Sequence, residues 1–109
     1  MGKPTEFLFN DQYTAQQLER YKIIFRLIKD LNIDSVFDCG CGTGSLLNYL
    51  INKKEMEPFG VELNPVAMRI LKRKILSEFS ENFDIKDLRK DEIHVDADLC
   101  IIFTSFLGK

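Results

Sequence analysis

Apolar residues recur at steps of three and four along residues 14–30, which is the spacing of one face of an α-helix. The residues on this spacing are Leu18, Tyr21, Phe25 and Ile28. Thr14 and Gln17 stand at the spacing of a capping box, in which two side chains satisfy free backbone N–H groups at a helix start. The pattern therefore predicts a helix that begins near Thr14 and ends near Asp30.

Short apolar runs that suit β-strands follow this segment. The runs cover residues 35–39, 59–63, 82–85 and 98–104. The first run has apolar side chains on both faces, as a central strand of a parallel sheet does. Two helices are expected between the first three runs, one over residues 45–52 and one that Asn64 caps and Pro65 begins. The apolar face of the second helix is expected at Met68, Leu71, Ile75 and Phe79.

The alternation of strands and helices predicts right-handed parallel βαβ units. Residues 87–96 interrupt it with a charged stretch, which we interpret as a loop with a short helical turn, and Asp87 and His94 are expected to face solvent. We therefore expect one α/β domain over residues 1–109, with a Rossmann-like parallel sheet of about four strands and helices on both faces.

Composition and charge narrow the classes of function. The formal net charge of the 109 residues is -2, so no overall positive field would hold a phosphate backbone, and nucleic acid is not supported as a partner. The longest apolar stretch, residues 99–103, is far shorter than the roughly 20 residues of a transmembrane helix. We expect no membrane association. The odd number of cysteines, three, suits reduced thiols in the cytoplasm. With a single histidine the chain offers too few ligands at the right spacing, so we expect no metal site.

Three glycines stand at every second position after the first expected strand. They are Gly40, Gly42 and Gly44. Because glycine has no Cβ, such a turn can take unusual backbone angles and let a ligand approach the main chain. The next helix points its amino end at the same place, which favours an anionic group, and Glu62 would face that crevice from the second strand. A carboxylate there can accept both hydroxyls of a ribose, so we predict a ligand with a ribose and an acidic end.

Two kinds of ligand fit this outline, and the spacing of the glycines separates them. The dinucleotide fingerprint needs glycine or alanine at position 45, where this chain has Ser45, which disfavours a nicotinamide-dependent oxidoreductase. The three glycines with Asp38 just before them instead resemble motif I of the class I S-adenosylmethionine-dependent methyltransferases. In register, the resemblance covers about residues 10–105.

The resemblance implies S-adenosyl-L-methionine as the cofactor and assigns it a site. The motif I residues would approach its methionine part, Glu62 would hold the ribose hydroxyls, and Asp84 and Ile85 would contact the adenine. The candidate cofactor-binding residues are Asp38, Gly40, Cys41, Gly42, Gly44, Glu62, Leu63, Asp84 and Ile85.

Members of that family carry seven strands in the order 3-2-1-4-5-7-6, so the resemblance implies the order 3-2-1-4 here, with the C-terminal strands absent. Residues 103–109 also lack the acidic or asparagine-type residue, two prolines and aromatic that amino-group methyltransferases place after the fourth strand. The methyl acceptor and the catalytic residues are therefore left unassigned.

The fourth strand has the composition of a central strand but would lie at an edge, where its backbone groups stay unpaired. An identical chain, a separate partner chain or a longer natural chain could cover it, and we favour a homodimer through this edge. The predicted function is that of a truncated S-adenosylmethionine-dependent methyltransferase domain. The alternative is a non-catalytic cofactor-binding or assembly module that needs a partner chain for activity.

Overall fold

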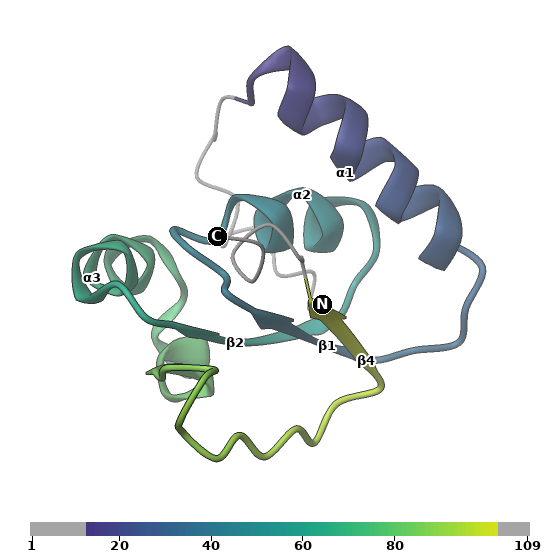
Figure 1. Cartoon of the computed structure of the whole chain (residues 1–109). Helices are drawn as coiled ribbons and strands as arrows, with labels where there is room; N and C mark the ends of the chain where they lie inside the picture. Colours follow the sequence, from purple (N-terminus) through teal and green to yellow (C-terminus); the bar gives the residue numbers. More distant parts are fainter. Residues whose placement is uncertain (1–12, 103–109) are drawn as a thin grey trace.

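The computed structural model describes residues 13–102, which form a four-stranded sheet with helices packed against it (Figure 1). The elements are α1 (Ala15–Ile28), β1 (Ser35–Cys39), α2 (Ser45–Lys53), β2 (Glu57–Glu62), α3 (Pro65–Lys74), the 3-10 helix η2 (Ser77–Asn82), β3 (Phe83–Ile85) and β4 (Leu99–Ile102). All four predicted strands and all three predicted α-helices are present. The predicted end of the fourth strand, at residues 103–104, lies outside the described residues.

The strands lie in the order β3-β2-β1-β4, and every neighbouring pair is parallel, as predicted. At the end of β1, Cys39 is level with Val61 of β2 and with Ile102 of β4. The carboxyl ends of the two central strands therefore meet, which places the glycine turn after β1 next to the end of β2.

Local capping fixes where two of the helices begin. Thr14 caps α1 in a complete capping box, with Gln17 N–H donating to Thr14 Oγ1 at 3.1 Å and Thr14 N–H donating to Gln17 Oε1 at 2.9 Å. Asn64 caps α3, because its Oδ1 accepts from the N–H of Val66 at 2.8 Å. Both starts agree with the sequence prediction.

The three α-helices lie on one face of the sheet, whereas the sequence predicted helices on both faces. Buried residues of α1, α2 and α3 form one cluster with Val36 of β1 and Phe83 of β3. The chain crosses from β1 to β2 and on to β3 in one direction, and right-handed crossovers keep the connecting helices on the same side. It reverses only between β3 and β4, and that crossover, residues 86–98, contains no helix (Figure 1).

The opposite face of the sheet is covered by that irregular crossover. A second apolar cluster there has Phe37, Cys39 and Val61 at its centre, and Leu88, Ile93 and Ala97 of the crossover pack against it. The cover does not reach all of β4, where Ile102 is 55% exposed. Within residues 13–102, no helix combines the length and the apolar character that crossing a membrane requires.

Candidate functional site

The turn between β1 and α2 needs glycine at three positions. Gly40, Gly42 and Gly44 have φ values of 83°, 58° and 90°, in the left-handed region that residues with a Cβ rarely adopt. The N–H groups of Gly40 and Cys41 both donate to the carbonyl of Val61, at 2.8 and 3.0 Å. The turn is therefore tied to the end of β2, and the spacing of its glycines reflects backbone geometry.

Open space lies in front of the middle glycine. A Cβ built at Gly42 would meet no atom within 4 Å, so the main chain there is bare toward the cleft. The side chain of Cys41 instead turns inward, and burial raises the pKa of its thiol well above the usual range. Cys41 thus lines the cleft mainly through its backbone.

A glycine within β2 makes room for that inward cysteine. A Cβ at Gly60 would lie 2.9 Å from Cys41 Sγ and 3.1 Å from the carbonyl oxygen of Asp38, distances that real Cβ atoms avoid. Gly60 is not among the site residues that the sequence predicts. The available signal was a glycine inside a strand, which often marks a close approach of another segment.

Glu62 ends β2 and points back at the glycine turn. Its Oε1 accepts from the N–H of Gly42 at 2.7 Å, and its Oε2 accepts from the N–H of Asn64 at 3.0 Å. A carboxylate offers about four lone-pair sites, so each oxygen retains one for a further donor. The main chain therefore fixes the orientation of this carboxylate and leaves it able to bind a pair of hydroxyls.

Asp38 is the most unusual charged group of the site. It is 2% exposed, and its Oδ1 has no hydrogen-bond partner. Burial, with a smaller contribution from the nearby charge of Glu62, raises the pKa of Asp38 to about 7. An unpartnered buried acceptor is costly, so a donor from a ligand would stabilise it.

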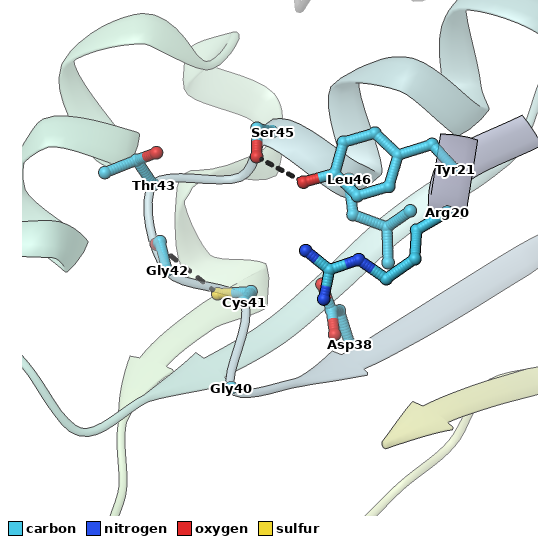
Figure 2. Close-up of a pocket in the computed structure, with 9 residues that line it drawn as sticks. All are labelled: Arg20, Tyr21, Asp38, Gly40, Cys41, Gly42, Thr43, Ser45 and Leu46. Atoms are coloured by element: carbon cyan, nitrogen blue, oxygen red, sulfur yellow. Dashed lines mark hydrogen bonds between the residues drawn. The ribbon is translucent and has the colours of Figure 1, made fainter. Parts of the chain in front are cut away.

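Asp38 faces a cavity of about 210 Å³ between the glycine turn and α1 (Figure 2). Its lining residues are Arg20, Tyr21, Asp38, Gly40, Cys41, Gly42, Thr43, Ser45 and Leu46. The guanidinium of Arg20 extends from α1 toward the Asp38 carboxyl group, and the Tyr21 hydroxyl lies 2.8 Å from Ser45 Oγ. From the sequence, Arg20 could reach the carboxylate of the cofactor, but a surface role is favoured, and Tyr21 is expected only on the apolar face of the helix.

The remaining predicted residues lie around the end of the sheet. Gly44 is the N-cap of α2, and Leu63, 51% exposed, follows Glu62 directly. Ile85 of β3 is level with Glu62 and is 47% exposed. Asp84 alternates with buried Phe83 along β3, so its side chain lies on the face away from the helices, with Lys86 Nζ 4.0 Å away.

Asp87 is buried, whereas the sequence predicted that it faces solvent. It is 8% exposed, and its Oδ1 accepts from the backbone N–H and from Nε of Arg89, at 3.0 and 3.1 Å. These hydrogen bonds lower the pKa of its carboxyl group. The predicted helical turn is present here, since the N–H of Asp91 donates to the Asp87 carbonyl, and His94 is exposed as predicted.

A metal centre has no basis in the part of the chain that the structure describes. Across residues 13–102, no three histidine, cysteine, aspartate or glutamate side chains gather as metal ligands would. The site therefore consists of a small cavity lined by the bare main-chain turn, the Asp38 carboxyl group and the Arg20 guanidinium, with the Glu62 carboxylate held at Gly42 beside it.

Comparison with protein families gives one match. The model of the family described as methionine biosynthesis protein MetW matches residues 18–97. A search of curated proteins gives no match.

Many solved structures are similar to the chain, and those compared here are methyltransferases by their descriptions. A StiE O-MT structure is 25% identical, with a TM-score of 0.61 over 77% of this chain. A TehB-like SAM-dependent methyltransferase from Corynebacterium glutamicum is 25% identical, with a TM-score of 0.59 over 86%. A SAM-bound amino pentose methyltransferase from Micromonospora echinaspora, involved in calicheamicin biosynthesis, is 23% identical, with a TM-score of 0.57 over 92%.

The matched region is only part of each of those proteins. The alignments cover 31%, 54% and 41% of the StiE, Corynebacterium and Micromonospora chains, respectively. The chain therefore spans between 31% and 54% of the length of these three proteins.

Proposed function

Because this chain belongs to the MetW family and has the class I methyltransferase fold, we propose that it binds S-adenosyl-L-methionine beside the glycine turn and serves in methyl transfer. The observation that carries the proposal is the carboxylate of Glu62, held by the N–H groups of Gly42 and Asn64. Its two free lone pairs suit the vicinal hydroxyls of a ribose, a pair that the nucleoside part of this cofactor presents.

Asp38 and Arg20 would bind the amino-acid end of the cofactor. The unpartnered Oδ1 of Asp38 would accept a hydrogen bond from the ammonium group, which satisfies a buried acceptor. The Arg20 guanidinium, from the other side of the same cavity, can bind a carboxylate through two parallel hydrogen bonds (Figure 2). The amino end of α2 adds partial positive charge near that carboxylate.

The glycines would admit the ligand, and two apolar side chains would contact its base. A bare main chain at Gly40 and Gly42 lets the methionine part lie against the turn, with Cys41 contributing its backbone and Gly44 the start of α2. Leu63 follows Glu62 directly and Ile85 is level with it on β3, and both side chains are exposed, so they would offer apolar contacts to an adenine. We do not extend the proposal to Asp84, whose carboxylate lies on the other face of the sheet.

When bound, S-adenosylmethionine supplies an electrophilic sulfonium methyl group. The residues of this chain would bind and orient the cofactor, and methyl transfer depends mainly on such positioning. We name no general base, because no described residue beside the cavity has a geometry that marks it as one.

Calorimetry with S-adenosylmethionine and S-adenosylhomocysteine tests the proposal. We expect Glu62→Gln to weaken binding by about tenfold, because it removes charge-assisted hydrogen bonds. Gly42→Val should abolish binding, since its side chain would occupy the space in front of the turn and the φ of 58° disfavours it. Circular dichroism of each variant checks that the fold persists. Absence of heat with either ligand at high protein concentration would contradict the proposal.

A second candidate is a cofactor-binding module that depends on another copy or on a partner chain. The exposed edge of β4, with Ile102 55% exposed, favours it. We propose a homodimer through this edge. We also propose a cytoplasmic location, because three free cysteines suit a reducing compartment. A chain that binds S-adenosylhomocysteine but transfers no methyl group until a second polypeptide is added would support the module.

A further inference from the structure

We propose that the hydrogen bond between Tyr21 and Ser45 is a positioning contact, which holds α1 so that Arg20 can bind the carboxylate of the cofactor. The inference rests on the proposed function and adds a residue pair to the same site. The Tyr21 hydroxyl lies 2.8 Å from Ser45 Oγ, and Ser45 is the first residue of α2. Both residues line the cavity that Arg20 enters (Figure 2).

Apolar contacts alone do not fix the exact placement of α1. Tyr21 and Ile28 are its buried residues, and three further apolar side chains of the helix, Leu18, Ile24 and Phe25, pack partly buried against the core. Because the hydrophobic effect is not directional, such contacts tolerate a small shift or rotation of the helix. Tyr21, midway along α1, adds a directional hydrogen bond at the cavity.

The tyrosine cluster around this contact fixes how α1 lies along α2. The Tyr21 ring packs against Tyr13 at 5.6 Å and against Tyr49 at 5.7 Å between ring centroids. Asn48 Nδ2 also donates to the Tyr13 hydroxyl at 2.7 Å. Ser45 and Asn48 are one turn apart, so two polar contacts on one side of α2 determine the register of α1.

Arg20 depends on this register because it is adjacent to Tyr21. Its long side chain is exposed and has many rotamers, so the position of its backbone decides whether the guanidinium reaches the cavity. Paired hydrogen bonds between a guanidinium and a carboxylate require good alignment, and a shift of about 1 Å at their base can cost much of their benefit. Tyr21 therefore acts through Arg20, and its loss should affect only ligands that have a carboxylate.

Two ligands separate this role from simple packing. S-adenosylhomocysteine carries the amino-acid end, whereas 5′-methylthioadenosine keeps the nucleoside and the sulfur but lacks it. We expect Tyr21→Phe to weaken S-adenosylhomocysteine binding about fivefold in calorimetry and to change 5′-methylthioadenosine binding less than twofold. The matched control is Tyr49→Phe, which removes a hydroxyl from the same ring cluster without touching Ser45, and it should leave both affinities unchanged.

A double-mutant cycle with S-adenosylhomocysteine alone provides the second measurement. Tyr21→Phe in an Arg20→Gln background should add almost nothing to the loss caused by Arg20→Gln, because the hydroxyl acts through the guanidinium. Equal weakening of both ligands by Tyr21→Phe, no effect on either, or additive losses in the cycle would overturn the inference. Failure of the unmodified chain to bind S-adenosylhomocysteine would instead overturn the proposed function.

Discussion

Ionisation of Asp38 should favour ligand binding but oppose folding, because its carboxyl group is buried and Oδ1 has no hydrogen-bond partner. In the protein without ligand, burial raises its pKa to about 7 from an ordinary 3.8. The neutral form is therefore favoured in the folded chain at mildly acidic pH. A cationic ligand group binds better to the ionised form, so Asp38 has to lose its proton when such a ligand binds.

We predict that affinity for S-adenosylhomocysteine rises by about tenfold between pH 6 and pH 8, as the fraction of ionised Asp38 in the free protein rises. Calorimetry across this range measures the change. Asp38→Asn should bind more weakly at pH 8 and should lose most of the pH dependence. A variant that keeps the full rise with pH would assign the titration to another group.

The stability of the ligand-free chain should change with pH in the opposite sense. Because the folded pKa of Asp38 lies above its unfolded value, the folded state binds more protons between these two values. The contribution of Asp38 to stability is therefore greatest below about pH 4. It decreases as the pH rises from about 4 to about 7 and does not change above that pH. Asp38→Asn should remove this fall and unfold at higher urea concentration than the unmodified chain at pH 8. An equal urea midpoint for both at pH 8 would contradict the burial of an ionised carboxylate.

At the scale of elements, β2 and the glycine turn depend on each other through Gly60. We predict that Gly60→Ala destabilises the chain by about 1–3 kcal/mol, because its Cβ would overlap Cys41 Sγ and the Asp38 carbonyl. Urea unfolding measures the loss. In a Cys41→Ala background the same substitution should cost less, since one of the crowded atoms is gone. Equal losses in both backgrounds would place the strain elsewhere.

The elements that the sequence predicted are those with local causes. Thr14 and Asn64 cap their helices by accepting hydrogen bonds from residues three and two positions away, respectively. The glycines of the turn all lie within residues 40–44. A short sequence window contains all the information that such features need. Their positions could therefore be predicted closely.

The features that the sequence could not predict depend on distant parts of the chain. The apolar pattern predicts one helix with Ile75 and Phe79 on its buried face, but α3 ends at Lys74. Phe79 lies instead in the separate 3-10 helix Ser77–Asn82, where it packs into the core. Which face the helices cover follows from the direction of each crossover, which local pattern does not contain. In the site, Glu62 and the glycines belong to a sequence motif, whereas Gly60 and Tyr21 join the site only through tertiary contacts. For Arg20 the sequence offers both a surface role and a contact with the cofactor's carboxylate, and only the tertiary structure places it at the cavity.

On the scale of the whole molecule, exposed apolar side chains lie on several elements, and one of them lies on the edge strand of the sheet. Leu27 on the outer side of α1 is 73% exposed, and Ile102 on the edge strand β4 is 55% exposed. An edge strand with apolar side chains is a template for pairing with another strand. Pairing of β4 with β4 of a second copy would satisfy the free backbone groups of both, and a two-fold axis makes the contact self-complementary.

We predict that the chain associates at high micromolar concentration and that Ile102→Lys shifts it toward monomers, because a charge at a sheet edge opposes pairing. Light scattering coupled to size-exclusion chromatography measures the mass. Ile70→Lys is the matched control, since Ile70 is also exposed, at 36%, but lies on α3 against the other half of the sheet. This control should leave the mass unchanged, and both variants should still bind S-adenosylhomocysteine, because neither residue lines the cavity. A monomeric unmodified chain, or association that survives Ile102→Lys, would show that two copies do not pair through β4.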